Sequence, residues 1–178
     1  VEVIEKGSTG FLGIKSKPAI IKARKKNDTV DNIREFLENV FSAMNMEVTI
    51  DIKKAEDDKV YEVELSGKEM GLLIGKRGQT LDSLQYLTNL AVNKHSDGYI
   101  KVKLDTEDYR QRRKDTLENL AKNIAYKVKR TKRPVSLEPM NPYERRVIHS
   151  TLQNDKFVTT HSEGDEPYRH VVVTLKRQ

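Results

Sequence analysis

The sequence predicts an α+β fold made of two small domains and a short β-rich segment before them. Three observations predict it. Apolar residues spaced three and four apart indicate helices, alternating apolar residues indicate short strands between them, and a glycine-bracketed turn joins two of the helices. With 178 residues the chain has room for one or two domains, and with 36% hydrophobic residues each core has to be small.

The first thirty residues predict a hairpin followed by a linker. Residues 1–5 and 19–23 favour strands on either side of a glycine-rich stretch, and two strands alone are barely stable. Residues 24–30 are basic and polar, which is typical of a linker.

Residues 31–105 contain the pattern of a first domain. A helix begins at Asp31, with Asp28 or Thr29 as its cap, and carries apolar residues from Ile33 to Met44 at helical spacing. Residues 47–53 and 59–65 alternate as the strands of a hairpin do, and residues 99–105 alternate again.

Between those strands, residues 70–94 predict a short helix, a tight turn and a longer helix. The turn is Gly75-Lys76-Arg77-Gly78, and its glycines allow a close approach to another group because they have no Cβ. The second helix starts near Gln79, so its free N–H groups point toward the two cations of the turn. This arrangement suits a phosphate.

The spacing decides which kind of phosphate site this is. A nucleotide-binding P-loop needs four residues between its glycines, whereas Gly71 and Gly75 enclose three, and Arg77 replaces the hydroxyl residue that would bind Mg²⁺. A Gly-x-x-Gly turn between two helices matches instead the loop with which KH domains clamp single-stranded nucleotides. The order of elements resembles the type II form of that domain.

This resemblance predicts a groove for bases beside the loop. We expect Leu73, Ile74 and Leu81 to line it, together with a strand residue such as Ile50. The segment lacks the paired aromatic residues of a stacking platform, so recognition by shape and hydrogen bonding is expected.

Residues 106–133 predict a long helix with one buried stripe. Lys122 and Lys129 lie on a second face of it, and residues 101–133 carry a net charge of +7. Two interpretations stay open, a solvated surface and an electrostatic contact with nucleic acid.

A second motif follows a short strand at residues 134–137. Asn141, Pro142 and Glu144 have the positions of a helix cap, a first helical residue and a capping box. On that helix Arg145 and His149 are four residues apart and share a face. The spacing Arg-x-x-x-His is the signature of the R-3-H domain, which is found with single-stranded nucleic acids.

Each residue of this motif has two interpretations. Arg145 offers a fork of donors for phosphate oxygens, and His149 can donate to a phosphate or stack on a base. His149 can equally be a structural residue that is hydrogen-bonded within the fold. Arg169, near the last strand, could serve the same anion site or pair with Glu166.

Taken together, the Gly-x-x-Gly loop and the Arg-x-x-x-His stretch with its surroundings resemble the bacterial Jag family. The resemblance implies a partial Jag N-terminal domain at residues 1–23, whose earlier part is missing, a linker at 24–30, a type II KH domain at 31–105 and an R-3-H domain at 106–178. It also implies cytoplasmic RNA binding, a small stand-alone KH protein or self-association as partner, and a role in cell elongation and envelope synthesis.

The sequence gives less support to other functions. Single-stranded DNA remains an alternative ligand, and a dimerisation scaffold remains an alternative role. The chain has no cysteine, no HExxH spacing and no Ser/His/Asp arrangement, so we predict no catalysis, no metal and no cofactor. No apolar run reaches the roughly 20 residues of a membrane span.

Overall fold

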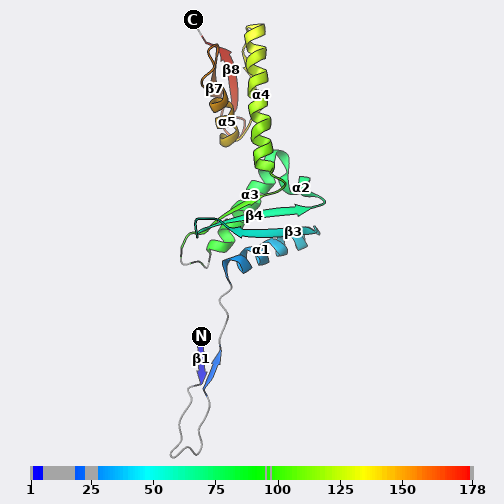
Figure 1. The fold of residues 1–178 in the computed structure, drawn as a ribbon, viewed down its shortest axis with the longest axis vertical. Helices are drawn as coiled ribbons and strands as arrows, with labels where there is room; N and C mark the ends of the chain where they lie inside the picture. The colour runs from blue at the N-terminus through cyan, green and yellow to red at the C-terminus, as the bar shows by residue number, and fades with distance from the viewer. Residues whose placement is uncertain (1, 6–18, 23–27, 95, 97, 177–178) are drawn as a thin grey trace, which may run out of the picture.

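The computed structural model describes residues 2–5, 19–22, 28–94, 96 and 98–176 (Figure 1). Most of the expected linker and the glycine-rich stretch of the N-terminal hairpin lie outside these residues. The elements, in chain order, are β1 (Glu2–Glu5), β2 (Ile20–Lys22), α1 (Thr29–Ala43), β3 (Val48–Lys54), β4 (Val60–Gly67), α2 (Met70–Ile74), the 3₁₀ turn η2 (Lys76–Gly78), α3 (Gln79–Asn93), β5 (Lys101–Asp105), α4 (Tyr109–Thr131), β6 (Val135–Ser136), α5 (Pro142–Leu152), β7 (Val158–Glu163) and β8 (His170–Leu175).

The predicted element types are confirmed, with one correction at the first helix. β1 and β2 form the expected antiparallel pair. Helix α1 begins at Thr29, inside the segment expected to be a linker, rather than at Asp31. The reason is the cap: the Asp28 carboxylate accepts a hydrogen bond from the Thr29 amide at 2.6 Å, so the helix can start immediately after it.

The first domain is a three-stranded sheet with its helices on one face. The strand order is β3-β4-β5, with β3 antiparallel and β5 parallel to β4. One face of the sheet packs on apolar residues of α1, α2 and α3. The other face carries alternating charges such as the Lys103–Glu62 pair and is exposed. The core therefore lies between sheet and helices, and the Gly75–Gly78 turn lies at its edge.

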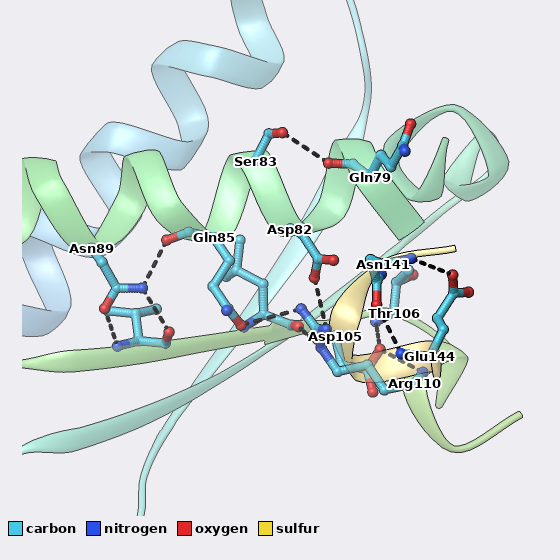
Figure 2. Close-up of polar contacts among 12 residues, drawn as sticks. Gln79, Asp82, Ser83, Gln85, Asn89, Asp105, Thr106, Arg110, Asn141 and Glu144 are labelled. Atoms are coloured by element: carbon cyan, nitrogen blue, oxygen red, sulfur yellow. Dashed lines mark hydrogen bonds and ion pairs between the residues drawn. The ribbon is translucent and has the colours of Figure 1, made fainter. Parts of the chain in front are cut away.

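Helix α3 is bound to the free edge of β5 through its amide side chains (Figure 2). Asn89 donates to the Val102 carbonyl at 2.9 Å and accepts from the Val102 amide at 2.8 Å. Asn93 does the same with Ile100, at 2.7 Å in both directions. Gln85 accepts from the amide of Leu104 at 3.0 Å. These side chains, four residues apart, occupy the backbone groups that another strand would otherwise pair with.

The second domain is an antiparallel sheet packed against two helices. Its strand order is β6-β8-β7, and its core contains apolar residues of α4, α5, β7 and β8. The predicted start of α5 is confirmed: the Asn141 side chain accepts from the Glu144 amide at 2.8 Å, and the Glu144 carboxylate accepts from the Asn141 amide at 3.3 Å.

Helix α4 links the two domains. Figure 1 shows it rising from the first domain and running alongside β8. Its first residue, Tyr109, packs against the first core, whereas Leu117, Ala121, Ala125 and Val128 belong to the second core. The start of α4 therefore lies beside the Gly75–Gly78 turn.

Two kinds of feature are absent from the described ranges. None of the helices there is both long and apolar enough to cross a membrane. Nor does the described part of the chain gather three or more histidine, aspartate or glutamate side chains in a way that could hold a metal ion.

The bonds between α3 and β5 lead to a stability prediction. Replacing Asn89 with alanine leaves both backbone groups of Val102 without their partner, which costs about 1–3 kcal/mol of unfolding free energy, although alanine is the better helix former. Urea denaturation measures this loss, and faster hydrogen exchange of the Val102 amide locates it.

The control is Ser83→Ala on the exposed side of α3, where the hydroxyl only donates back to the Gln79 carbonyl at 2.8 Å. It should stay within about 0.5 kcal/mol of the parent chain. An Asn89→Ala chain as stable as the control would show that the side chain contributes nothing to holding α3.

Candidate nucleic-acid interface

The Gly75–Gly78 turn has the backbone conformation that requires its glycines. Gly75 has φ = 67° and Gly78 has φ = 81°, both in the region that side chains with a Cβ rarely adopt. A Cβ on Gly75 would lie 2.0 Å from the Thr80 hydroxyl, and one on Gly78 would lie 2.7 Å from the ring of Tyr109. The expected close approach therefore takes place within the chain itself, against the starts of α3 and α4.

The two cations of the turn have different surroundings. Lys76 is exposed and has no ion-pair partner among the residues that the structure describes. Arg77 is only partly exposed, because its guanidinium donates to the Glu138 carboxylate and to the Pro139 carbonyl. Lys76 is therefore available to a ligand, whereas Arg77 ties the turn to the segment before α5.

A hollow of about 330 Å³ lies between the turn and α4. Ile74, Gly75 and Arg77 line one side of it. The other side comes from α4, with Arg112 and Arg113 in addition to Tyr109 and Thr116. The hollow places two further guanidinium groups beside the Gly-x-x-Gly turn.

Acidic side chains neutralise part of this basic surface. Arg113 donates to Glu144 at 2.5 and 2.8 Å, and Glu144 is almost completely buried. Arg112 lies 3.5 Å from Glu107 in an exposed pair. Surface pairs of this second kind are weak, so Arg112 can exchange its partner for a phosphate more easily than Arg113 can.

The prediction of which residues line a base groove is wrong for most of them, because their side chains are buried. Leu73 and Leu81 are 0% exposed and belong to the first core, as does Ile50 at 8%. Their side chains fill the space between helices and sheet, so they do not line a surface groove. Ile74 is half-buried and does line the hollow beside the turn.

The Arg-x-x-x-His pair is also used inside the fold. Arg145 is 9% exposed and donates to the Met140 carbonyl at 2.7 Å and to Glu166 at 2.6 Å. His149 lies between two hydroxyls of β7, with Nδ1 2.6 Å from Thr160 Oγ1 and Nε2 2.9 Å from Ser162 Oγ. Of the two interpretations of each residue, the structure supports the structural one.

The remaining predicted cationic residues differ in how far contacts within the chain occupy their charged groups. Arg169 donates to the carbonyls of Gly164 and Ser162 at 2.8 and 3.4 Å, and so shapes the β7–β8 turn instead of pairing with Glu166. Lys129 pairs with Asp155 at 2.6 Å and lies over the Phe157 ring. Lys122 is exposed on α4. Only Lys122 of these three has the surroundings of a solvent-facing contact.

Three family models match successive parts of the chain. The Jag N-terminus matches residues 1–25, the KH domain of KhpA/KhpB matches residues 31–104, and the R-3-H domain matches residues 115–175. Among curated proteins, the RNA-binding protein KhpB of Clostridium symbiosum is 67% identical over 177 residues, which cover 99% of this chain and 80% of that protein. The chain belongs to the KhpB family.

Other KhpB proteins are more distant. Those of Bacillus subtilis and Lactiplantibacillus plantarum are 39% and 37% identical, over 99% and 90% of this chain and 86% and 50% of their own lengths. The resemblance to the Jag family drawn from the two motifs is confirmed. So is the α+β fold in which a KH domain is followed by an R-3-H domain and preceded by a Jag N-terminal segment.

Sequence reasoning missed several residues that surround the loop in this KhpB-family chain. Tyr109, Arg112 and Arg113 lie within the basic segment at residues 101–133. No neighbouring residue in the sequence indicates that they face the Gly-x-x-Gly turn. The spacing offers one signal: the strand before α4 ends at Asp105, so α4 has to begin at the edge of the sheet where β5 ends.

The environment of His149 predicts a pH dependence of stability. Burial lowers the pKa of His149 below its ordinary value, and the positive charge of Arg145 and of protonated His161 lowers it further. Below about pH 6.5 the unfolded chain therefore takes up a proton more readily than the folded one, and stability falls as the pH drops through the lowered pKa. Above about pH 6.5 His149 is neutral in both the folded and the unfolded chain, so its protonation no longer changes the stability.

Replacing His149 with glutamine removes this proton uptake, so unfolding free energy should change less between about pH 7 and pH 5 than in the parent chain. Replacing His170, whose Nδ1 lies 3.2 Å from the Tyr168 carbonyl, with glutamine should keep the parent slope. The two pH profiles can be compared by urea denaturation. Equal slopes for all three chains would mean that His149 is not the group responsible.

Proposed function

We propose that the chain binds single-stranded RNA at the Gly75–Gly78 turn, with the sugar-phosphate backbone in the hollow between this turn and α4. The observation that carries the proposal is this hollow, in which the turn and the guanidinium groups of Arg112 and Arg113 face one space. Lys76 stands exposed beside it. Several cations around one hollow suit phosphate oxygens.

The family supports RNA as the ligand. The KhpB relatives are described as RNA-binding proteins, and KH domains hold single strands by their backbones. A second contact would come from the R-3-H domain through α4, where Lys122 is exposed, and not through Arg145 and His149, which are engaged inside the fold. The chain would act as a binding protein without catalysis, in the cytoplasm, as a regulator of cell elongation and envelope synthesis.

Single-stranded DNA is the nearest alternative ligand. The described surface around the turn offers cations to phosphates, which both nucleic acids carry, so the discrimination rests on groups that read the 2′-hydroxyl. Affinities for RNA and DNA oligomers of the same sequence separate the two ligands, and we expect the RNA to bind more tightly.

A second candidate function, assembly through the KH domain, is favoured by an apolar patch on α3. Tyr86, Leu87 and Leu90 are 64%, 51% and 53% exposed and lie within about one turn of each other. Neighbouring exposed apolar side chains of this kind are typical of a protein contact. The partner would be a second copy of the chain or a small stand-alone KH protein.

The proposed RNA site predicts the effect of reversing one charge. Lys76→Asp should weaken binding of single-stranded RNA about ten-fold or more, because an attractive charge beside the phosphates is replaced by a repulsive one. The dependence of affinity on salt should also become less steep, by about 0.7 logarithmic unit for each phosphate that is no longer neutralised. Fluorescence anisotropy at several salt concentrations measures both quantities.

Lys94→Asp, at the far end of α3, makes the same charge change away from the turn and is the matched control. Lys76→Asp should leave the molar mass in solution unchanged, whereas Leu90→Glu should reduce any self-association and leave RNA affinity intact. If Lys76→Asp and Lys94→Asp bind RNA equally well, the turn is not the RNA site.

A further inference from the structure

A second, larger hollow adjoins the first, with which it shares Arg77, Tyr109 and Arg113, and lies where both domains meet. It has a volume of about 560 Å³, within the roughly 300–1,000 Å³ of small-ligand pockets. Gly78 and Arg77 form its edge on the KH side. The start of α5 contributes Pro142 and Tyr143 on the R-3-H side. The hollow thus begins at the turn proposed to hold the RNA backbone.

Two tyrosines from different elements line this hollow. Tyr109 comes from the first turn of α4 and Tyr143 from the first turn of α5, 34 positions later in the chain. Tyr143 is 59% exposed, so its ring is open to a ligand. Tyr109 is half-buried against Gly78 and the first core. The KH segment lacks paired aromatic residues, and the hollow supplies two rings, Tyr109 from the helix that joins the domains and Tyr143 from the R-3-H domain.

The polar groups of the hollow fall into two sets. Asn141, Glu144 and Arg113 are occupied with one another, in the capping box and in the Arg113–Glu144 pair. Asp82 of α3 and Arg110 of α4 form a half-exposed pair at 2.8 Å, drawn in Figure 2 beside Asn141 and Glu144. Because this second pair is far more exposed than Glu144, Asp82 and Arg110 can exchange part of their mutual contact for the donor and acceptor groups of a base edge.

The phenol of Tyr109 adds a further donor. Burial raises the pKa of Tyr109 above its ordinary value, so the hydroxyl stays protonated at neutral pH. The lining thus combines flat apolar surfaces with hydrogen-bonding groups of both kinds and lies directly beside a backbone-binding turn.

From this combination we infer that the hollow is a nucleobase-binding site, in which a base of the single strand held at the Gly75–Gly78 turn stacks on Tyr143. The inference rests on the proposed RNA binding. It differs from a backbone contact because it depends on the presence of a base. It also requires both domains, since the KH side supplies Gly78 and Asp82 and the R-3-H side supplies Tyr143.

The arrangement gives Arg77 a role other than phosphate binding. Its bonds to Glu138 and Pro139 join the turn to the segment that leads into α5, and its side chain lines the hollow. Arg77 is therefore engaged within the chain and links the turn to the segment before α5.

The test uses the full chain and single-stranded oligoadenosine of about ten nucleotides, longer than the roughly four that a KH loop clamps. Tyr143→Ala should weaken its binding about ten-fold, the expected worth of one base stacked on an aromatic ring. Tyr143→Phe should bind like the parent chain, because stacking needs the ring and not the hydroxyl. Tyr99→Ala, which removes a 69%-exposed tyrosine near the other end of α3, should have no effect.

A second ligand separates base binding from other effects. An oligomer of the same length made of abasic ribose-phosphate units should bind Tyr143→Ala and the parent chain equally. Equal weakening for both oligomers would overturn the inference, because it would show that Tyr143 acts on the backbone or on the fold. Crosslinking with 4-thiouridine-containing RNA should in addition label the peptide that carries Tyr143.

The failure of this inference is distinguishable from the failure of the proposed function. If Lys76→Asp weakens binding and Tyr143→Ala does not, the RNA site stands and the base site is excluded. If neither substitution changes binding, both are excluded. Crosslinks confined to β7 and β8 would also overturn the base site.

Discussion

Helix α3 is attached to the free edge of β5 by its own amide side chains, and this attachment decides where the Gly75–Gly78 turn lies. Asn89 bonds to both backbone groups of Val102 in β5. Asn93 bonds in the same way to Ile100, the residue just before β5. Because the turn directly precedes α3, it is fixed relative to the sheet. Because α4 follows β5, its first residues are fixed relative to the same edge. Arg110 strengthens the junction, donating to the Leu104 carbonyl at 3.0 Å and to Asp82.

Fewer cations are available at the interface than the net charge of the basic segment suggests. Residues 101–133 carry a net charge of +7, yet Arg113 and Lys129 are paired with acidic residues in other parts of the second domain. Such pairs occupy α4 cations with partners on α5 and before β7, and so leave fewer cations for a polyanion. Lys76, Arg112 and Lys122 keep more exposure and therefore remain available to a nucleic acid.

Local patterns were sufficient to predict most elements of this fold. The start of α5 illustrates why: its cap, proline and capping box are all within four residues, so the sequence contains the whole interaction. Non-local contacts could not be predicted in this way. Nothing around Arg145 indicates that Glu166 neutralises it, and the burial of Leu73 and Leu81 depends on how closely the helices approach the sheet. The position of Tyr109 and Tyr143 on one hollow likewise depends on how the two domains meet.

The central claim is that RNA binds at the Gly75–Gly78 turn and the adjoining start of α4. The most direct measurement is nuclear magnetic resonance of the isotope-labelled chain during titration with single-stranded RNA. The account predicts that the largest shifts of backbone amide signals occur at Gly75, Lys76 and Gly78, with further shifts at Arg112. Shifts restricted to α5, β7 and β8, or to the charged open face of the first sheet, with the turn unchanged, would contradict it.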